Sequence, residues 1–467
     1  MAKRYPLIII GGGSAGFAAA TRANDKGIKT AMINSGPIGG TCVNVGCVPS
    51  KYLLESTNFY THARKPPFEG VGPCDSTLDF AKMMAGKSRL VEGLRESNYR
   101  RVLADMRSVT LYEGRATFVG VKSIRVGREA LEAEKILIAV GARPTVPVYP
   151  GIEEVGVLTS DDLLELREPP ESMIVVGGRA LALEFAQVFS RLGSKVTLLQ
   201  RSDRILPQHE PAVSEALARY LTGEGVNIHT GVMIDRLSKD EDLKRVEATV
   251  NGKHVSFDAS EILFATGRKP DLDGLGLGSA GVETLDGFVK VDEYCRTSNP
   301  SVYAAGDCAV GGTQLETLAA KMGNAAVRNA FEGASVSINL REIPSVVFTD
   351  PQVAAVGYTE EEYMERMGHC SCRTVEMGLV PKAQIIRDAR GLVKVVVDPK
   401  TKRLVGGQIV AHNAAELIHE LTIAVKFGLT IDDVIGTTHV FPTMSEGIKK
   451  ACQAFYRDVS KMSCCIE

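Results

Sequence analysis

The stretch YPLIIIGGGSAGF, residues 5–17, decides the fold of the first part of the chain. Its apolar run predicts a buried strand over Tyr5 to Ile10, then a helix from about Ser14 to Lys26 and a second strand over Lys29 to Ile33. Glycines between strand and helix have the G-x-G-x-x-G spacing that lets a dinucleotide pyrophosphate approach the helix N-terminus. The loop residues expected to bind the nucleotide are Gly11, Gly13, Ser14 and Gly16.

The position after the second strand usually holds an acidic residue that binds a ribose hydroxyl. This chain has Asn34 there. An amide oxygen also accepts a hydrogen bond from a hydroxyl, so the departure weakens the nucleotide motif without cancelling it.

A second strand–loop–helix unit follows, with a strand over Met173 to Val176 and a helix over Arg179 to Leu192. Its loop keeps Gly177 but has Arg179 in place of the middle glycine and Ala182 in place of the third, where alanine is tolerated. Arg179 either obstructs the approach of a dinucleotide or contacts a phosphate itself. The unit predicts a second nucleotide site.

Arginines follow the next predicted strand, Lys195 to Leu199. Gln200, Arg201 and Arg204 occupy the place where NADH-binding proteins have a carboxylate, which would repel a 2′-phosphate. Arginines at this place favour NADPH over NADH. The alternative is that these arginines only form a solvated surface.

Two apolar segments repeat one pattern, KILIAVGARP at residues 135–144 and EILFATGRKP at residues 261–270. Each predicts a strand that ends in a glycine turn, and Gly141 lies in the first of them. The repeat indicates two related dinucleotide-binding domains.

The stretch GGTCVNVGCVPSK, residues 39–51, holds two cysteines separated by four residues. It predicts the first turns of a helix, where N–H groups favour a thiolate, and the pair could close a small disulfide and reopen it. Zinc sites usually show two residues between paired cysteines and a second such pair, which the sequence lacks. Cys42 and Cys47 could instead be small buried hydrophobes, but their polar neighbours and the nearby nucleotide loop favour redox chemistry.

The chain has 467 residues, a formal net charge of -2 and 44% hydrophobic residues. This length fits about three domains. The absence of a basic cluster argues against nucleic acid as a partner. Glycines interrupt the apolar run from Leu7 to Ala20, so we expect no membrane insertion and a cytoplasmic protein. The cysteines expected to be ordinary packing or surface residues are Cys74, Cys295, Cys308, Cys370, Cys372 and Cys452.

The remaining chain begins with a mostly helical segment, about residues 79–107, that carries Tyr99. Asp307 follows a strand and could accept a hydrogen bond from a ribityl hydroxyl or cap a nearby helix. Beyond about residue 340 the sequence is rich in strands, with helices expected over Ala414 to Phe427 and Ser445 to Asp458. The chain ends in two adjacent cysteines, Cys464 and Cys465. Exposed thiolates of this kind bind soft metal ions.

Two nucleotide loops around a Cys-x4-Cys helix make the whole chain resemble the flavin-dependent pyridine nucleotide disulfide oxidoreductases. The resemblance implies an α/β fold with two Rossmann-like domains, FAD-binding residues 1–150 and NADPH-binding residues 151–270. Residues 271–340 would complete the FAD domain, and residues 341–467 would form the α+β interface of a homodimer.

The resemblance also implies roles for individual residues. Cys42 and Cys47 would form a redox disulfide, with Cys47 against the flavin and Cys42 facing the substrate, and Lys51 would pair with Glu184 near the flavin ring. The cofactor contacts would be Gly11, Gly13, Ser14, Gly16, Asn34, Gly40, Thr41, Lys51, Gly141 and Asp307 for FAD, and Gly177, Arg179 and Arg201 for NADPH.

Family members that reduce disulfides carry a His-Pro-Thr sequence near the end, whose histidine shuttles protons. Here Phe441 precedes the Pro-Thr pair, and His439 lies two places away, where it would project elsewhere. A missing acid–base group does little harm when the substrate is a metal ion that takes only electrons. With the terminal pair Cys464 and Cys465, the chain resembles the members that reduce mercuric ion.

In those members the terminal pair captures Hg(II) and passes it to Cys42 and Cys47 of the partner subunit, so all four cysteines would bind the metal. Tyr99 matches a tyrosine of the transfer site, and Phe441 stands where a second tyrosine often occurs. The expected reaction is reduction of Hg(II) to Hg(0) by NADPH through FAD. A reductase of small disulfides is the nearest alternative, and a metal-sequestering protein is one from another class.

Overall fold

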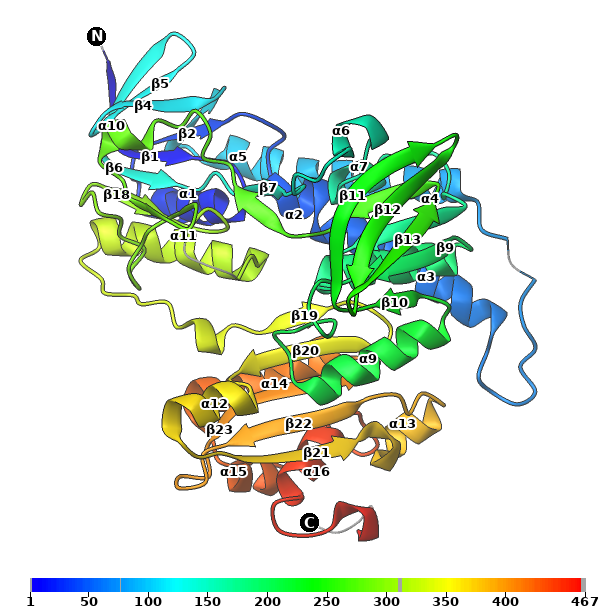
Figure 1. Cartoon of the computed structure of the whole chain (residues 1–467). Helices are drawn as coiled ribbons and strands as arrows, with labels where there is room; N and C mark the ends of the chain where they lie inside the picture. Colours follow the sequence, from blue (N-terminus) through cyan, green and yellow to red (C-terminus); the bar gives the residue numbers. More distant parts are fainter. Residues whose placement is uncertain (1, 76, 310–312, 463–467) are drawn as a thin grey trace. The chain divides into compact units, whose positions relative to one another are not determined.

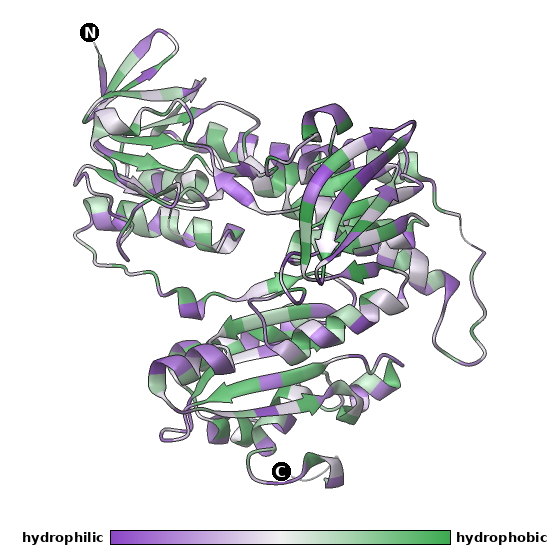
Figure 2. Ribbon diagram, viewed as in Figure 1, coloured by the Kyte–Doolittle hydropathy of each residue, from purple (hydrophilic) through white to green (hydrophobic). Residues whose placement is uncertain are grey.

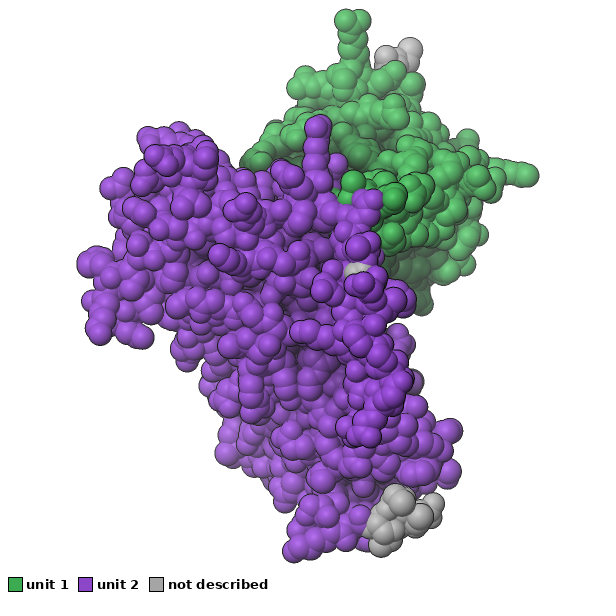
Figure 3. Space-filling model, turned by 90° about the vertical axis from the view of Figure 1, so that its right-hand side faces the viewer, with its two compact units in different colours: residues 1–52, 81–145, 267–339 green, residues 53–80, 146–266, 340–467 purple. Residues whose placement is uncertain are grey.

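The computed structural model describes residues 2–75, 77–309 and 313–462. The chain divides into two compact units, each made of three segments (Figure 3). The first unit contains residues 1–52, 81–145 and 267–339, and the second contains residues 53–80, 146–266 and 340–467.

The first unit is built on a sheet of seven strands within the described residues, with β1 (Lys3–Ile10) at its centre (Figure 1). β1 pairs in parallel with β2 (Thr30–Asn34) and with β6 (Glu129–Ile138). Ile8 and Ile9 are fully buried, and burial of each such side chain contributes about 1.5–3 kcal/mol. The predicted strand, glycine loop and helix are confirmed, because β1 leads through the glycines into α1 (Ser14–Asp25).

The same sheet continues outward through β3, β18, β5 and β4, of which β5 and β4 are antiparallel. The further elements of this unit are β3 Val109–Glu113, β4 Ala116–Gly120, β5 Ser123–Val126, β18 Val302–Ala304, the short strands β7 Ala142–Pro144, β15 Arg268–Pro270, β16 Thr284–Leu285 and β17 Phe288–Val289, and the helices α2 Gly40–Val45, α4 Phe80–Arg95, η1 Glu96–Arg100, α5 Arg101–Asp105, α10 Leu277–Ala280 and α11 Glu316–Phe331; α3 Cys47–Arg64 begins here.

The second unit holds the other nucleotide-binding sheet, whose four parallel strands have the order β10-β9-β8-β14. A separate antiparallel sheet, β11-β12-β13, follows β10 in the sequence. The elements of this part are β8 Ser172–Val176, β9 Lys195–Leu199, β10 Asn227–His229, β11 Val232–Asp240, β12 Leu243–Val250, β13 Lys253–Ala259, β14 Glu261–Phe264, α6 Ile152–Val155, α7 Ser160–Leu163, α8 Ala180–Arg191 and α9 Pro211–Gly223. The expected strand–loop–helix repeat is therefore confirmed.

The C-terminal part of this unit is an antiparallel sheet with the order β19-β20-β23-β22-β21. Its central strands are largely green in Figure 2, and α14 and α16 bury one face of the sheet in a shared apolar core. The elements are β19 Ser345–Val347, β20 Gln352–Gly357, β21 Ser371–Glu376, β22 Leu392–Val397, β23 Leu404–Ala411, α12 Glu360–Met367, α13 Pro381–Ile385, α14 Ala414–Phe427, α15 Ile431–Gly436, α16 Glu446–Gln453, and the short η2 Leu340–Glu342, η3 Met377–Leu379 and η4 Val459–Lys461. The edge strand β21 was not predicted from the sequence.

Two expected helices have different limits. The cysteine helix is interrupted at Gly46, whose φ of -126° and ψ of -115° are not helical. The last helix stops at Gln453 rather than Asp458, and the Asp458 carboxylate accepts the Ser460 N–H and caps the next short turn. No helix among the described residues has the length and apolarity that a membrane crossing needs.

Candidate functional site

The first nucleotide loop has the close backbone contacts that only glycine allows. Gly11 has a φ of +116°, and a Cβ there would overlap the carbonyl oxygen of Ala139. A Cβ at Gly16 would overlap the carbonyl oxygen of Gly11. No described side chain caps α1 at Gly13, and its first turn, which starts at Ser14, holds no acidic residue. Its N–H groups and dipole therefore fit the pyrophosphate of a dinucleotide.

Asn34 braces this loop at the end of β2. Its Oδ1 accepts a hydrogen bond from the Gly12 amide at 3.1 Å, and its Nδ2 donates to the Gly36 carbonyl at 2.5 Å. Oδ1 already accepts one hydrogen bond, so one lone pair is left for a ribose hydroxyl, a contact that stays a prediction.

Asp307 lies beyond β18 and caps no helix among the described residues, where the next helix, α11, begins at Glu316 with Leu315 as its N-cap. Burial raises the pKa of Asp307, and the Arg268 charge opposes that effect. A partly buried carboxylate of this kind fits a hydroxyl donor such as a ribityl chain. Gly141 has a φ of +72° in the turn after β6, and its cofactor contact also stays a prediction.

The redox loop packs against the first nucleotide loop through glycines. Gly39 has a left-handed φ of +94° as the N-cap of α2, and its N–H donates to the Gly12 carbonyl at 2.9 Å. A Cβ at Gly40 would lie 2.6 Å from the Cα of Gly13. The helix α2 carries Thr41 and Cys42 in its first turn, so this packing brings a cysteine close to the predicted cofactor-binding loop.

The side chain of Asn44 stabilises the redox loop by hydrogen bonds, a role that was not predicted from the sequence. Its Nδ2 donates to the carbonyls of Gly40 at 2.8 Å and Ile38 at 3.1 Å. Its Oδ1 accepts from Nε of Arg95 at 2.7 Å. A polar amide between the two valines of the Cys-x4-Cys segment was the available signal.

The two redox cysteines have opposite proton affinities. A hydrogen bond from the Cys42 thiol lowers the pKa of Cys47 to about 7; burial opposes this effect and the Lys51 ammonium adds to it. The same hydrogen bond, with burial, raises the pKa of Cys42. Cys47 is therefore the thiolate of the pair near neutral pH, and Cys42 is the thiol that donates to it.

Tyr99 and Glu316 complete the surroundings of the cysteine pair. The Tyr99 ring packs edge-on against Phe17, with centroids 4.8 Å apart. Burial raises the pKa of Tyr99, and the charges of Cys42, Glu316 and Cys47 add to the effect. Glu316, in the first turn of α11, also raises the pKa of both cysteines. Glu316 was not predicted from the sequence, where its only signal was an acidic residue at a helix start.

The second nucleotide loop, in the other unit, repeats the backbone geometry of the first. Gly177 has a φ of +129°, and a Cβ there would lie 2.5 Å from the Ala265 carbonyl oxygen. Ala182, in place of the third glycine, is fully buried beside it. Arg179 is the exposed N-cap of α8, and Arg201 is exposed after β9. Both guanidinium groups are accessible to phosphates.

Glu184 lies in α8, 2% exposed, and accepts a hydrogen bond from the Phe348 amide at 2.9 Å. Lys51 and Glu184 fall in different compact units, so their pairing stays a prediction. Cys464 and Cys465 lie outside the described residues.

The position of the missing proton shuttle is filled by an exposed Phe441. His439 is engaged elsewhere, with its Nε2 2.9 Å from Oε1 of Glu420 and its Nδ1 2.9 Å from the Thr437 carbonyl. Among the described residues, Oε2 of Glu446 is buried without a hydrogen-bond partner. Within the described residues, no histidine lies beside the Glu446 carboxylate in the place of the histidine of a His-Pro-Thr sequence.

Comparisons with known proteins agree with this geometry. Residues 5–327 match the pyridine nucleotide-disulphide oxidoreductase family, and residues 343–452 match its dimerisation domain. Mercuric reductase of Bacillus cereus is 41% identical over 99% of this chain and 73% of its own length. Mercuric reductase of Streptomyces lividans is 38% identical over 99% of this chain and 98% of its own length.

A solved structure described as the Cu(II) complex of the HOCl-induced flavoprotein disulfide reductase RclA from Escherichia coli superposes with a TM-score of 0.86. It is 29% identical and covers 98% of this chain and 100% of its own. The redox loop, the two nucleotide loops and these matches lead to one conclusion. The chain belongs to the pyridine nucleotide-disulphide oxidoreductase family, whose fold and cysteine pair imply FAD and NAD(P)H as cofactors.

Proposed function

We propose that this protein reduces Hg(II) to Hg(0) with electrons from NADPH, through FAD and the Cys42–Cys47 pair. The observation that carries the proposal is a complete redox dithiol without the histidine that disulfide-reducing relatives use. The similarity to mercuric reductases, at 38–41% identity over 99% of the chain, supports the same assignment.

The cysteine pair suits a thiophilic ion. FAD, when bound, would pass one electron pair from NADPH to the disulfide and a second pair, from a second NADPH, to the metal. Cys42, facing the substrate, would lose its proton as it binds Hg(II), and the Cys47 thiolate would be the second sulfur ligand. Soft ions such as Hg(II) prefer thiolate ligands, and exchange between thiols moves the ion without releasing it.

The chemistry also explains the missing base. Reduction of a small disulfide needs a proton for the leaving thiolate, which a positioned histidine supplies. Conversion of Hg(II) to Hg(0) takes two electrons and places no proton on the metal. Phe441 at this position and the unpartnered Oε2 of Glu446 therefore fit a metal substrate better than a disulfide.

The assay that tests the proposal follows NADPH oxidation by the holoenzyme with Hg(II), oxidised glutathione, lipoamide or Cu(II) as acceptor. We expect turnover with Hg(II), with release of Hg(0) vapour, and loss of that turnover in Cys42→Ala/Cys47→Ala. Cu(II) is included because the RclA structure is described as a Cu(II) complex. Preferred turnover of glutathione, lipoamide or Cu(II) would overturn the assignment. A colourless preparation that binds Hg(II) without oxidising NADPH would indicate a sequestering protein.

We further propose that the protein is a cytoplasmic homodimer in which Cys464 and Cys465 deliver Hg(II) to Cys42 and Cys47 of the partner subunit. The dimerisation-domain match at residues 343–452 supports the assembly. A mixed dimer of a Cys42→Ala/Cys47→Ala subunit and a Cys464→Ala/Cys465→Ala subunit should recover about one working site of two at low thiol concentration. A mixed dimer as inactive as both parents would show that delivery does not cross the interface.

A further inference from the structure

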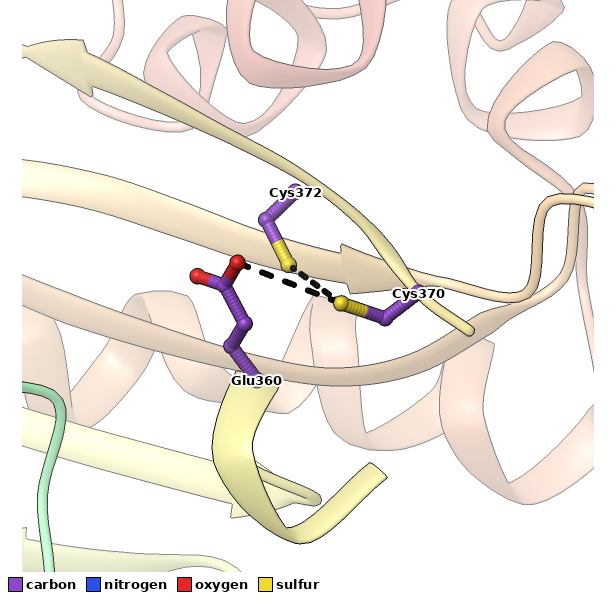
Figure 4. Close-up of side chains that lie close together, drawn as sticks. All are labelled: Glu360, Cys370 and Cys372. Carbon is purple, nitrogen blue, oxygen red and sulfur yellow. Dashed lines mark hydrogen bonds between the residues drawn. The ribbon is translucent and has the colours of Figure 1, made fainter. Parts of the chain in front are cut away.

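Two cysteines outside the redox loop lie side by side at the edge of the C-terminal sheet (Figure 4). Cys370 immediately precedes β21 and Cys372 is its second residue. Residues two apart on a strand project to the same face, which explains why the two thiols meet. Their sulfur atoms are 3.7 Å apart, and both side chains are partly buried. From the sequence, both were predicted to be ordinary packing or surface residues.

A carboxylate faces the same two thiols. Oε1 of Glu360 lies 3.9 Å from the Cys370 sulfur, and one ligand atom from each of the three residues lies within 4.8 Å of the others. Glu360 is the first residue of α12, whose start is held by a capping box between Thr359 and Glu362. Its backbone N–H also donates to the buried Glu210 carboxylate at 2.6 Å. The carboxylate is therefore carried by an anchored helix end.

Lys394 orients that carboxylate. Its ammonium donates to Oε2 of Glu360 at 2.7 Å and to Oε2 of Glu210 at 2.8 Å. Lys394 itself is 9% exposed and comes from β22, next to the edge strand. The hydrogen bond from Lys394 uses Oε2 of Glu360, and Oε1 faces the thiols. An orienting partner behind a carboxylate ligand is the usual arrangement at metal sites.

We propose that Glu360, Cys370 and Cys372 bind a divalent cation of the zinc class, with a fourth position open to water. Tetrahedral geometry with metal–sulfur bonds of about 2.3 Å and a metal–oxygen bond of about 2.1 Å places the sulfurs about 3.8 Å apart and each sulfur about 3.6 Å from the oxygen. The observed separations of 3.7 and 3.9 Å are close to both values.

Two other arrangements fit less well. A linear ion between two thiolates would need sulfurs about 4.6 Å apart, twice the usual metal–sulfur bond. A disulfide needs sulfurs about 2.0 Å apart and Cα atoms usually about 4.4–6.8 Å apart. Residues two apart on a strand have a Cα separation of about 6.6 Å, near the upper end of that range. The two sulfurs lie 3.7 Å apart, a separation that suits a shared cation and is too long for a covalent bond.

The local charges also favour a cation. With both thiols ionised, the site would hold two thiolates and the carboxylates of Glu360 and Glu210 against the single ammonium of Lys394. A divalent ion would offset most of this excess negative charge and would tie the start of α12 to the edge strand.

The test uses the full-length holoenzyme with Cys42, Cys47, Cys464 and Cys465 replaced by alanine, so that those thiols bind no metal. The protein is reduced, equilibrated with Zn(II) or Cd(II), desalted and analysed for bound metal, and Cd(II)–thiolate absorption reports sulfur ligation. We expect one equivalent per chain. Flavin absorbance confirms that each variant is folded.

Substitutions show which residues bind the metal. Cys370→Ser/Cys372→Ser, and Cys372→Ser alone, should lose the equivalent, and Glu360→Gln should weaken the affinity by about tenfold or more. Cys74→Ser and Glu361→Gln are matched controls that should change nothing, because Cys74 is exposed outside the cluster and Glu361 neighbours Glu360 on the exposed side of α12. Equal metal content in Cys370→Ser/Cys372→Ser and its parent would overturn the proposal. A stable Cys370–Cys372 disulfide found by mass analysis would overturn it too. Neither outcome depends on mercury reduction.

Discussion

Removal of the Cys42 thiol should change the acidity of Cys47. The hydrogen bond from Cys42 is the largest cause that lowers the pKa of Cys47 to about 7, while burial acts in the opposite direction. In Cys42→Ala the donor is lost and the burial stays. The pKa of Cys47 should then rise to the ordinary cysteine value of about 8.5 or above.

The expected size follows from these two values. At pH 7 the thiolate fraction of Cys47 would fall from about one half to about 3%. Thiolates of higher pKa are more nucleophilic, with a Brønsted slope of about 0.4–0.5, so the alkylation rate at pH 7 would fall only about threefold. The midpoint of the pH profile, which should move by about 1.5, is therefore the sharper measurement.

The assay is alkylation of Cys47 by iodoacetamide in the reduced holoenzyme, followed by mass spectrometry of the Cys47 peptide from pH 5 to 10. Cys42→Ser is the matched control, because its hydroxyl still donates a hydrogen bond and should hold the midpoint nearer to 7. Lys51→Met should raise the midpoint by less than Cys42→Ala, since the lysine charge is the smaller cause. A midpoint near 7 in Cys42→Ala would refute the reasoning.

Three further outcomes test other parts of the structure. Replacing Arg201 with Glu should raise the KM for NADPH well above that for NADH, if its guanidinium binds the 2′-phosphate; equal changes would assign Arg201 to the surface only. Gly40→Ala should reduce FAD retention on gel filtration, because the new Cβ would lie 2.6 Å from the Cα of Gly13 at a φ of +63°, and unchanged flavin content would contradict the close-approach argument. The Asp350 carboxylate raises the pKa of His62 through a hydrogen bond, so its stabilisation is complete below the unfolded pKa of about 6.5 and is lost as pH rises through the folded pKa. His62→Ala should therefore lower the urea midpoint more at pH 6 than at pH 9, and the reverse order would disprove the ion pair.

Local patterns were enough to predict much of the fold. The apolar run before Gly11 and the glycine spacing predicted β1, the loop and α1, because strand periodicity and tight turns depend on neighbouring residues. The same reasoning found β8 and α8 around Gly177. A redox role for Cys42 and Cys47 was predicted from their spacing and neighbours.

The limits of that prediction lay where distant segments meet. The spacing predicted one helix through both cysteines, but the backbone turns at Gly46, where a Cβ would lie 2.9 Å from the Thr41 carbonyl oxygen. The hydrogen bond from Arg95 to the redox loop and the effect of the Glu316 charge on the cysteines could not be predicted from neighbouring residues. Both Arg95 and Glu316 are far from the cysteines in the sequence.

The sequence by itself determined the strand–glycine–helix units and the types of residue that do the chemistry, since these follow from short-range spacing. Only the tertiary structure decided which thiol of the redox pair is ionised, because the pKa of Cys47 depends on the partners that the fold places around it. The same holds for the C-terminal cluster. Cys370 and Cys372 are a bare Cys-x-Cys in the sequence, and they become a candidate metal site only because α12 brings Glu360 beside them.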